Sequence, residues 1–344
     1  MIIKLSLFFL IGSLIIDPTG DFYSLKYLSA ALALLVFGAN LIMHRKIPTL
    51  NFFQVLIYLT FALIMPLYGL LITFLNSGLN KISDTSYLGF SSFLLILFPA
   101  IFIEAKTFLK ILIIALRVLS CITVLILLSF LYDTDSLGIA QFFIDKKSML
   151  VGFREYGGIK TYFLYFTAAP LLIILVAYDA YNLYNKITLG NIILCFISIC
   201  SIFLTGTRFN MLMAIIILPT IIAVYNFSIG KIWLYLTLFF IFLIILSQSS
   251  FISSFFNSND NSNSVKIGYL ETYTSIFKDP KVIVFGQGFS GYDNSVLFKN
   301  MLIKFENEGV KTELTFIELY RVFGVIFGSF FNLVLFSAPF FLYK

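Results

Sequence analysis

The charged residues of this chain that could do chemistry lie beside or inside long apolar runs. Arg208 sits in the segment TGTRFN between two short apolar stretches, and Arg321 lies inside the last apolar run. A guanidinium stays charged at physiological pH and can hold two oxygens of one phosphate group. Because a charge inside a membrane segment is costly, such arginines are expected to serve a function. Two structural interpretations stay open: Arg208 reaching lipid phosphates, and Arg321 pairing with Glu318 one helical turn earlier.

The composition indicates that these arginines belong to an integral membrane protein. Hydrophobic residues make up 60% of the chain and charged residues 12%, and the mean hydropathy is +1.00. Runs of about 20 apolar residues can cross the bilayer as α-helices. We therefore predict an all-α polytopic membrane protein, a single transmembrane domain over residues 1–344 with about ten spans. The predicted spans are about 2–16, 26–43, 53–75, 87–103, 108–131, 161–181, 190–205, 211–226, 231–248 and 315–342.

The distribution of basic residues predicts the orientation of these spans. Most of them fall on the side of the N-terminus, which is cytoplasmic by the positive-inside rule. Two longer loops, 132–160 and 249–314, then lie on the extracytoplasmic face. Residues 249–264 are rich in turn formers and are predicted to be mobile. The remainder of that loop favours short amphipathic helices, which end at the glycine turns of Gly286, Gly288 and Gly291.

Other residue types exclude several classes of site. The three cysteines lie inside apolar runs, which favours packing over disulfides, and a single histidine cannot form a His-based metal site or triad. No metal site is predicted; Asp133 and Asp135 are a weak candidate for binding a cation. The net charge of +6 fits basic cytoplasmic loops rather than nucleic-acid binding. Arg117, inside a predicted span, is expected to reach toward the cytoplasmic surface or to pair within the helix bundle.

Three segments follow one another in the C-terminal half of the chain. They are FLTGTRFNMLMAIIILP around Arg208, FGQGFSGYDN from Phe285, and ELTFIELYRVFGVIFGSFF from Glu313. In this order, with a large loop between the first and the last, they resemble the O-antigen polymerase and O-antigen ligase superfamily over residues 195–335. The ligases of that superfamily keep a histidine where Glu313 stands, whereas an acidic residue there is familiar among the polymerases. The resemblance therefore implies a polymerase.

The resemblance also implies a substrate and a location. It implies a metal-independent glycosyltransferase, without a cofactor, that joins polyprenyl-pyrophosphate-linked oligosaccharide repeat units into O-antigen or capsule. The enzyme would be a multi-pass protein of a bacterial cytoplasmic (inner) membrane, with membrane lipid and a chain-length regulator as further partners. In this interpretation Glu313 accepts the proton of the acceptor hydroxyl and Arg208 stabilises the pyrophosphate. Arg154, Arg321 and Tyr292 would bind the substrate.

Each of these roles has a plainer alternative. Glu313 could be a carboxylate that only favours the start of a helix, and Arg154 could be a solvated charge in a loop. Tyr292 and Tyr273 could stack on sugar rings, but tyrosines are common at membrane surfaces in any case.

Two other functions share these sequence features. A ligase-like glycan transferase would carry the same motifs, and a flippase or other transporter of lipid-linked glycans would also be polytopic and lined by arginines. A transporter is expected to show internal repeats and short loops, and the sequence shows neither. The polymerase is therefore the favoured function.

Overall fold

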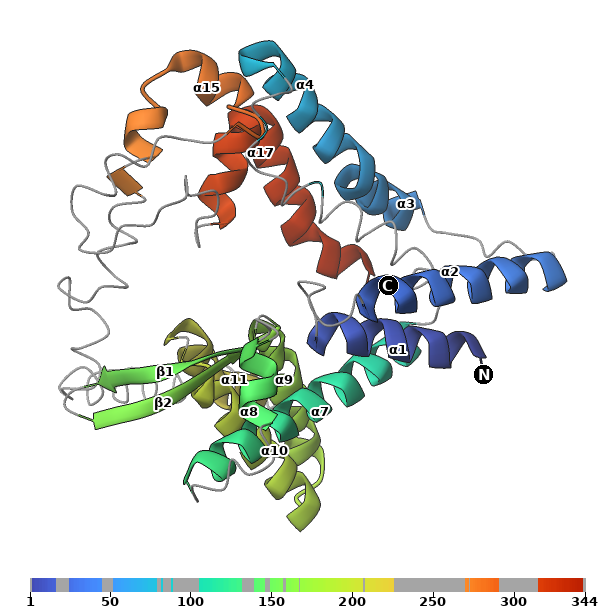
Figure 1. The fold of residues 1–344 in the computed structure, drawn as a ribbon, viewed down its shortest axis with the longest axis vertical. Helices are drawn as coiled ribbons and strands as arrows, with labels where there is room; N and C mark the ends of the chain where they lie inside the picture. Colours follow the sequence, from blue (N-terminus) through green and yellow to red (C-terminus); the bar gives the residue numbers. More distant parts are fainter. Residues whose placement is uncertain are drawn as a thin grey trace. The chain divides into compact units, whose positions relative to one another are not determined.

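The structure is a computed structural model, and its described residues form two compact units (Figure 1). Unit 1 comprises Met1–Arg45 and Ile103–Phe256, and unit 2 comprises Lys46–Phe102 and Asn257–Lys344. Most of the described residues are helical, in agreement with the predicted class. The residues that the structure describes are 2–16, 25–44, 52–78, 82, 88, 105–131, 139–145, 149–156, 159–166, 168–206, 208–225, 270–271, 273–290 and 315–342.

Four helices in this described part of the chain are long and apolar enough to cross a membrane. They are Leu25–Met43, Phe52–Asn76, Lys106–Phe130 and Ile317–Val334, and shorter apolar helices occupy Ile2–Ile16, Leu189–Leu204 and Asn210–Ile221. Their lengths and composition support the membrane-embedded character predicted from the sequence. The predicted spans 87–103, apart from Leu88, and 231–248 lie outside the described residues, as does the segment 249–264.

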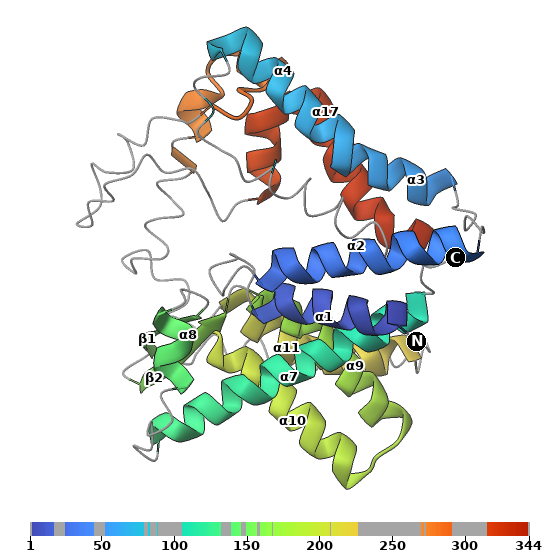
Figure 2. The same ribbon diagram turned by 45° about the vertical axis from the view of Figure 1, so that its right-hand side comes forward.

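The N-terminal part of unit 1 is a set of packed apolar helices. α1 (Ile2–Ile16) lies against both α2 (Leu25–His44) and α7 (Ala105–Leu131), and Figure 2 shows the three side by side. The hydroxyl groups of Ser13 and Ser29 share a buried hydrogen bond of 2.5 Å between α1 and α2. Each hydroxyl also hydrogen-bonds a carbonyl oxygen of its own helix, that of Leu10 or of Lys26, so the Ser13–Ser29 pair adds a polar contact between the two helices.

Polar contacts also join two further helices of unit 1, α9 (Leu172–Asn185) and α10 (Leu189–Leu204), to α7. The Ser120 hydroxyl on α7 donates to the Ser201 hydroxyl on α10 at 2.9 Å. Arg117 on α7 forms an ion pair with Asp179 on α9, which confirms that this arginine pairs within the helix bundle. α11 (Arg208–Tyr225) packs against α9 and α10.

Unit 1 also contains a β-hairpin, which the prediction of an all-α protein did not include. β1 (Met149–Tyr156) pairs antiparallel with β2 (Ile159–Phe166). The prediction of a span over 161–181 is therefore wrong at its start, because the helix there begins only with the 3₁₀ turn η4 (Ala169–Leu171) and continues as α9. The residues Gly157 and Gly158 between the strands suit a two-residue hairpin turn, and aromatic residues favour strands. The predicted loop 132–160 also holds a short helix, α8 (Ile139–Asp145).

Unit 2 is built on two apolar helices and the short helix α15. α3 (Phe52–Leu59), the π-helical turn η1 (Thr60–Ile64) and α4 (Met65–Ser77) follow one another without a gap. The described residues of this unit also include α15 (Pro280–Phe285) and α17 (Thr315–Leu342). Its core gathers apolar side chains from these elements and from the turn after α15: Phe61, Met65, Phe289, Leu319, Val322, Phe323 and Phe331.

Candidate functional site

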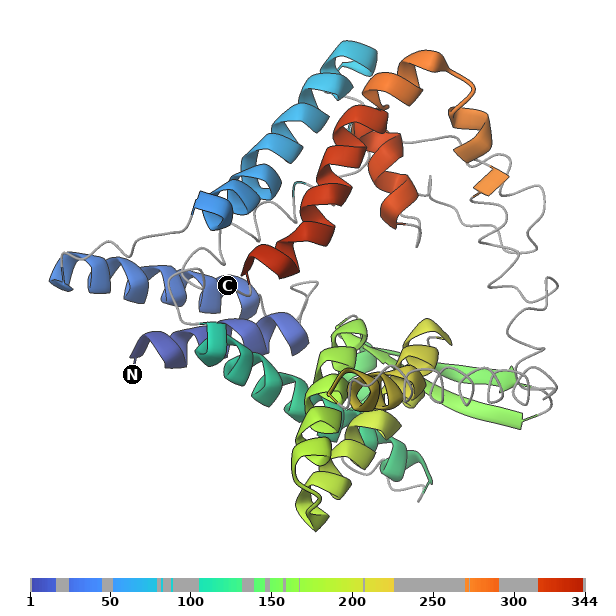
Figure 3. The same ribbon diagram turned by 180° about the vertical axis from the view of Figure 1, so that it is seen from behind.

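The last apolar helix of unit 2 is interrupted at Gly324. This residue of α17 has a φ of 71° and a ψ of 176°, which is not a helical conformation. Figure 3 shows the two helical segments of α17 meeting at an angle. A break of this kind frees backbone carbonyl groups, and these need other partners within a membrane.

The turn that follows α15 satisfies the freed carbonyl groups. The N–H of Gln287 donates to the carbonyl oxygen of Arg321 at 2.7 Å, and the N–H of Gly288 donates to that of Val322 at 3.0 Å. The predicted glycine turn is confirmed at Gly286 and Gly288, whose φ angles are 85° and 71°. Two segments that lie far apart in the sequence are thus joined backbone to backbone.

Glycine is required both in the turn after α15 and at the break in α17, because the two backbones lie close together there. A Cβ atom on Gly286 would lie 2.6 Å from the backbone nitrogen of Gly324. A Cβ atom on Gly324 would lie 2.6 Å from the carbonyl carbon of Val284 and 2.7 Å from the nitrogen of Gly286. Both glycines also have positive φ angles, which other residues adopt only with strain.

We expect Gly324→Ala to separate the turn from α17. Its backbone conformation is nearly restricted to glycine and costs other residues about 1–3 kcal/mol, before the collision with Val284 is counted. The unfolding midpoint of the purified protein in detergent should therefore fall. Gly38→Ala in α2 is the matched control, because nothing lies within 4 Å of the added Cβ and the substitution favours a helix. Equal midpoints for the two variants would contradict the role of Gly324.

Side chains of α4 hold the same turn from the other side. The N–H of Phe289 donates to the Thr73 hydroxyl at 2.6 Å, and this hydroxyl donates to the Gly69 carbonyl at 2.7 Å. The Tyr68 hydroxyl donates to the Phe285 carbonyl at 3.0 Å. The turn is therefore fixed between α4 and the break in α17.

A buried polar centre lies directly beside the break. Arg321 is fully buried, and its Nε donates to the two carboxylate oxygens of Glu318 at 2.9 and 3.0 Å. Its Nη2 donates to Glu318 at 2.5 Å, and its Nη1 donates to the side-chain oxygen of Gln287 at 3.1 Å and to the carbonyl oxygen of Ser290 at 3.0 Å. The Tyr273 hydroxyl donates to Glu318 at 2.5 Å. The pairing of Arg321 with Glu318, left open by the sequence, is confirmed.

These contacts decide what two of the predicted site residues can do in this conformation. The guanidinium of Arg321 is engaged by protein oxygens on several sides, so it fastens the turn to α17 and would have to release a partner to bind a substrate. Tyr273 is 3% exposed and its hydroxyl is held by Glu318, so its ring is closed to a sugar. Sequence reasoning did not identify Gln287 and Ser290 as partners of Arg321, because such contacts leave no local pattern.

A turn lies just before Arg208 in unit 1, between the predicted spans 190–205 and 211–226. α10 ends at Leu204, and the N–H of Gly206 donates to the Phe203 carbonyl at 3.2 Å. Gly206 has a φ of 66°, and α11 begins at Arg208. The apolar run is thus broken by a tight turn that places Arg208 at the first position of a helix.

The hairpin brings Arg154 toward the same end of unit 1. Phe163 of β2 packs against the turn, since a Cβ atom on Gly206 would lie 2.7 Å from the Cβ of Phe163. In the hairpin register Phe163 pairs with Gly152, and Arg154 stands opposite Thr161. Arg154 therefore lies two residues after Gly152 in β1. Gly152 is the register partner of Phe163, which contacts the turn before Arg208.

Asn210 is a residue of this region that the sequence did not single out. It lies in the first turn of α11 and is 6% exposed, and its side-chain nitrogen has no hydrogen-bond partner among the residues that the structure describes. A buried amide donor without a partner is uncommon and often marks a group that a bound molecule satisfies. The signal in the sequence was its place two residues after Arg208 at the start of an apolar run.

Glu313, Tyr292 and Gly291 lie outside the described residues. Comparison with protein-family models, with curated proteins and with solved structures finds no match to the chain. The class that the structure defines is therefore a mostly helical protein with apolar helices of membrane-spanning length.

Proposed function

We propose that the protein is a polymerase that joins polyprenyl-pyrophosphate-linked oligosaccharide repeat units on the extracytoplasmic face of a bacterial cytoplasmic membrane. The observation that carries the proposal is the contact between two segments of the sequence resemblance. The glycine turn and the last helix meet through the bonds from Gln287 to Arg321 and from Gly288 to Val322. Segments that resemble two motifs of one superfamily thus form one structural element.

The surroundings of Arg208 support a role in binding an anion. A positive charge at the first position of a helix opposes the helix dipole, so Arg208 does not serve the stability of α11. The same position favours anions, because the free N–H groups of the first turn and the guanidinium act together. The side-chain amide of Asn210, which has no partner among the described residues, adds a donor at this end of unit 1, and the strand that carries Arg154 belongs to the hairpin that contacts the same turn. A pyrophosphate group has the charge and the oxygen atoms that such donors recognise.

The reaction that we propose is a single displacement. The acceptor hydroxyl attacks the anomeric carbon of the donor chain, and the bond between that carbon and the pyrophosphate oxygen breaks. The hydroxyl proton passes to the Glu313 carboxylate, and the lipid pyrophosphate leaves with the bonding electrons. Arg208 stabilises the negative charge that develops on the leaving oxygen.

The replacement Arg208→Ala tests this function. We expect the variant to insert and accumulate while polymer is lost, and Arg208→Lys to restore little, because an ammonium cannot reproduce a two-point grip on phosphate. Lys281→Gln, at an exposed position, is the control. The measurement is the profile of surface polysaccharide and of lipid-linked oligosaccharide in cells.

The same profile separates the proposed function from the other two. Loss of a polymerase leaves single repeat units on the surface, whereas loss of a ligase leaves long chains on the lipid carrier. Loss of a flippase leaves the repeat unit on the inner face. Polymer of normal length in the Arg208→Ala strain would remove this arginine from the site.

A further inference from the structure

A second arginine lies within the apolar helices of unit 1. Nη2 of Arg117 on α7 donates a hydrogen bond to the carboxylate of Asp179 on α9. The Asp179 side chain is 3% exposed and the Arg117 side chain is 26% exposed. The ion pair therefore buries the acid, whereas part of the arginine side chain stays exposed at the surface of the bundle.

The rest of this guanidinium has no protein partner in the described part of the chain. Arg117 donates from Nη2 to Asp179, and neither its Nε nor its Nη1 donates to any described residue. A guanidinium carries five N–H donors. Unpaired donors are costly in an apolar environment, and those of Arg117 lie within a helix long enough to cross a membrane. A molecule with negatively charged oxygens would satisfy them.

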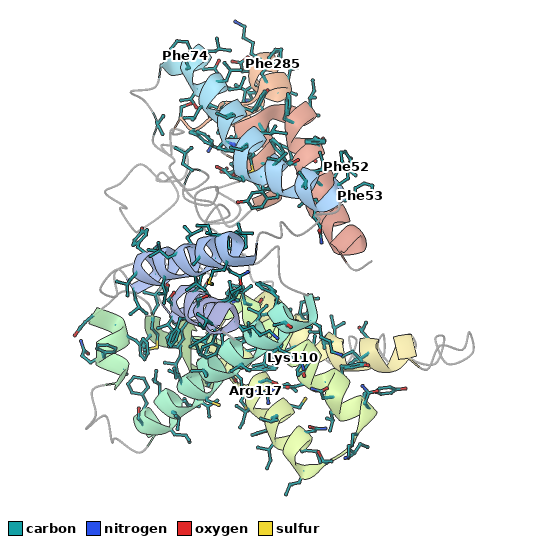
Figure 4. All side chains as sticks on the ribbon, turned by 90° about the vertical axis from the view of Figure 1, so that its right-hand side faces the viewer. Phe52, Phe53, Phe74, Lys110, Arg117 and Phe285 are labelled. Atoms are coloured by element: carbon teal, nitrogen blue, oxygen red, sulfur yellow. The ribbon has the colours of Figure 1, made fainter. Side chains whose placement is uncertain are left out.

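Arg117 stands at the edge of the exposed face of α7. Ile114, Val118 and Leu125 are 52%, 44% and 60% exposed and form an apolar stripe along that face. Lys110 is exposed on the same side of the helix as Arg117, because a separation of seven residues returns to nearly the same direction. Figure 4 shows Lys110 and Arg117 on this helix. The exposed face thus combines cations with an apolar surface.

The spacing along α7 suits a ligand with a charged end and an apolar tail. The exposed Lys106 lies one turn before Lys110, and about 10 Å of helix separates Lys110 from Arg117. α7 has 27 residues, about 40 Å of helix, which is longer than the apolar core of a bilayer about 30 Å thick, and its first turns, which carry Lys106 and Lys110, are the end that suits the headgroup region. The lysines therefore lie at the depth of lipid headgroups, and the arginine lies nearer the acyl chains.

We propose that an anionic phospholipid binds along this face of α7. Its phosphate lies between Lys110 and the N–H groups of Arg117 that have no partner among the described residues, Lys106 adds positive charge one turn earlier, and an acyl chain lies along Ile114 and Val118. Asp179 holds the guanidinium at the edge of the bundle, where one side faces the ion pair and the other faces the lipid. This site is independent of the glycan chemistry proposed above.

Fluorescence quenching by brominated lipids tests the site. The chain has one tryptophan, so Ile114→Trp in a Trp233→Phe background places a single probe on the stripe. The full-length protein is reconstituted in phosphatidylcholine with brominated phosphatidylglycerol or brominated phosphatidylcholine. We expect the anionic lipid to quench more than its mole fraction predicts, whereas equal quenching by both lipids would overturn the proposal.

Charge variants identify the cations that hold the lipid. Each basic residue near a membrane surface contributes about 1 kcal/mol to attraction of anionic lipid, so Lys110→Gln should lower the preference about fivefold. The double variant Arg117→Gln with Asp179→Asn removes both charges of the ion pair without leaving one alone, and it should lower the preference further. Lys281→Gln should change nothing. An unchanged preference in both test variants, or displacement of the lipid by inorganic phosphate, would overturn the proposal.

Discussion

The replacement Arg321→Leu is expected to destabilise the protein by about 3–5 kcal/mol, because it leaves the Glu318 carboxylate buried without its cation. Glu318 is 5% exposed, and the Tyr273 hydroxyl is the partner that it would keep among the contacts described. The same replacement removes the hydrogen bonds from Arg321 to Gln287 and Ser290. Unfolding of the purified protein in a denaturing detergent, followed by circular dichroism, measures the loss.

Two further variants show whether the loss comes from the unpaired charge. Replacing Glu318 and Arg321 together by methionine and leucine should recover much of the stability, since exchanging a buried ion pair for apolar residues is often nearly neutral. Lys278→Gln removes an exposed charge from the same unit and should have little effect. If Arg321→Leu unfolds at the same denaturant concentration as the wild type, the buried centre does not hold the turn to α17.

The position of the last helix could be predicted, but its break could not. The predicted span 315–342 coincides with α17, because a predominantly apolar run of that length is the main signal for a membrane helix. Gly324 interrupts the helix without a change in hydropathy. A glycine inside an apolar run is compatible with a straight helix or with a break, and the choice here depends on Val284 and Gly286, which lie about 40 residues earlier and meet it in the fold.

The hairpin was missed for a related reason. The residues of β2 are aromatic and apolar, and a short apolar run fits a buried helix or a strand equally well. The pair Gly157 and Gly158 between two such runs was the available signal, since this spacing is typical of a tight hairpin. The prediction treated residues 161–181 as one apolar helix, so it included most of β2 in the helix that follows the strand.

The candidate site divides in the same way between local and distant contacts. The turn before Arg208 and the pairing of Arg321 with Glu318 involve residues that are close in the sequence, so both could be inferred from the sequence alone. The partners Gln287 and Tyr273 come from a loop that no periodicity connects to α17. They also change the interpretation of Arg321, which the sequence suggested as a substrate ligand and which the structure shows fastening a turn.

The last prediction concerns the proton of the acceptor hydroxyl. If Glu313 accepts that proton, Glu313→Gln keeps the size and hydrogen-bonding reach of the side chain but removes the base. The expected loss is about 10²–10⁴-fold in rate, which is the usual contribution of general-base catalysis. Binding of the donor should survive, because arginines hold the pyrophosphate in this mechanism. Purified protein and a synthetic lipid-pyrophosphate repeat unit allow the rate and the donor affinity to be measured separately.

A structural role for Glu313 makes a different prediction. α17 begins at Thr315, two residues after Glu313, and a carboxylate near the start of a helix stabilises it by about 0.3–1 kcal/mol. In that case Glu313→Gln would lower the unfolding midpoint slightly and leave polymerisation nearly normal. Glu271→Gln, which changes an exposed carboxylate of the same unit, is the control for loss of a charge alone. Near-normal turnover by Glu313→Gln would therefore exclude it as the base, whereas a large loss of rate with unchanged donor affinity and stability would exclude the helix-end role as the explanation.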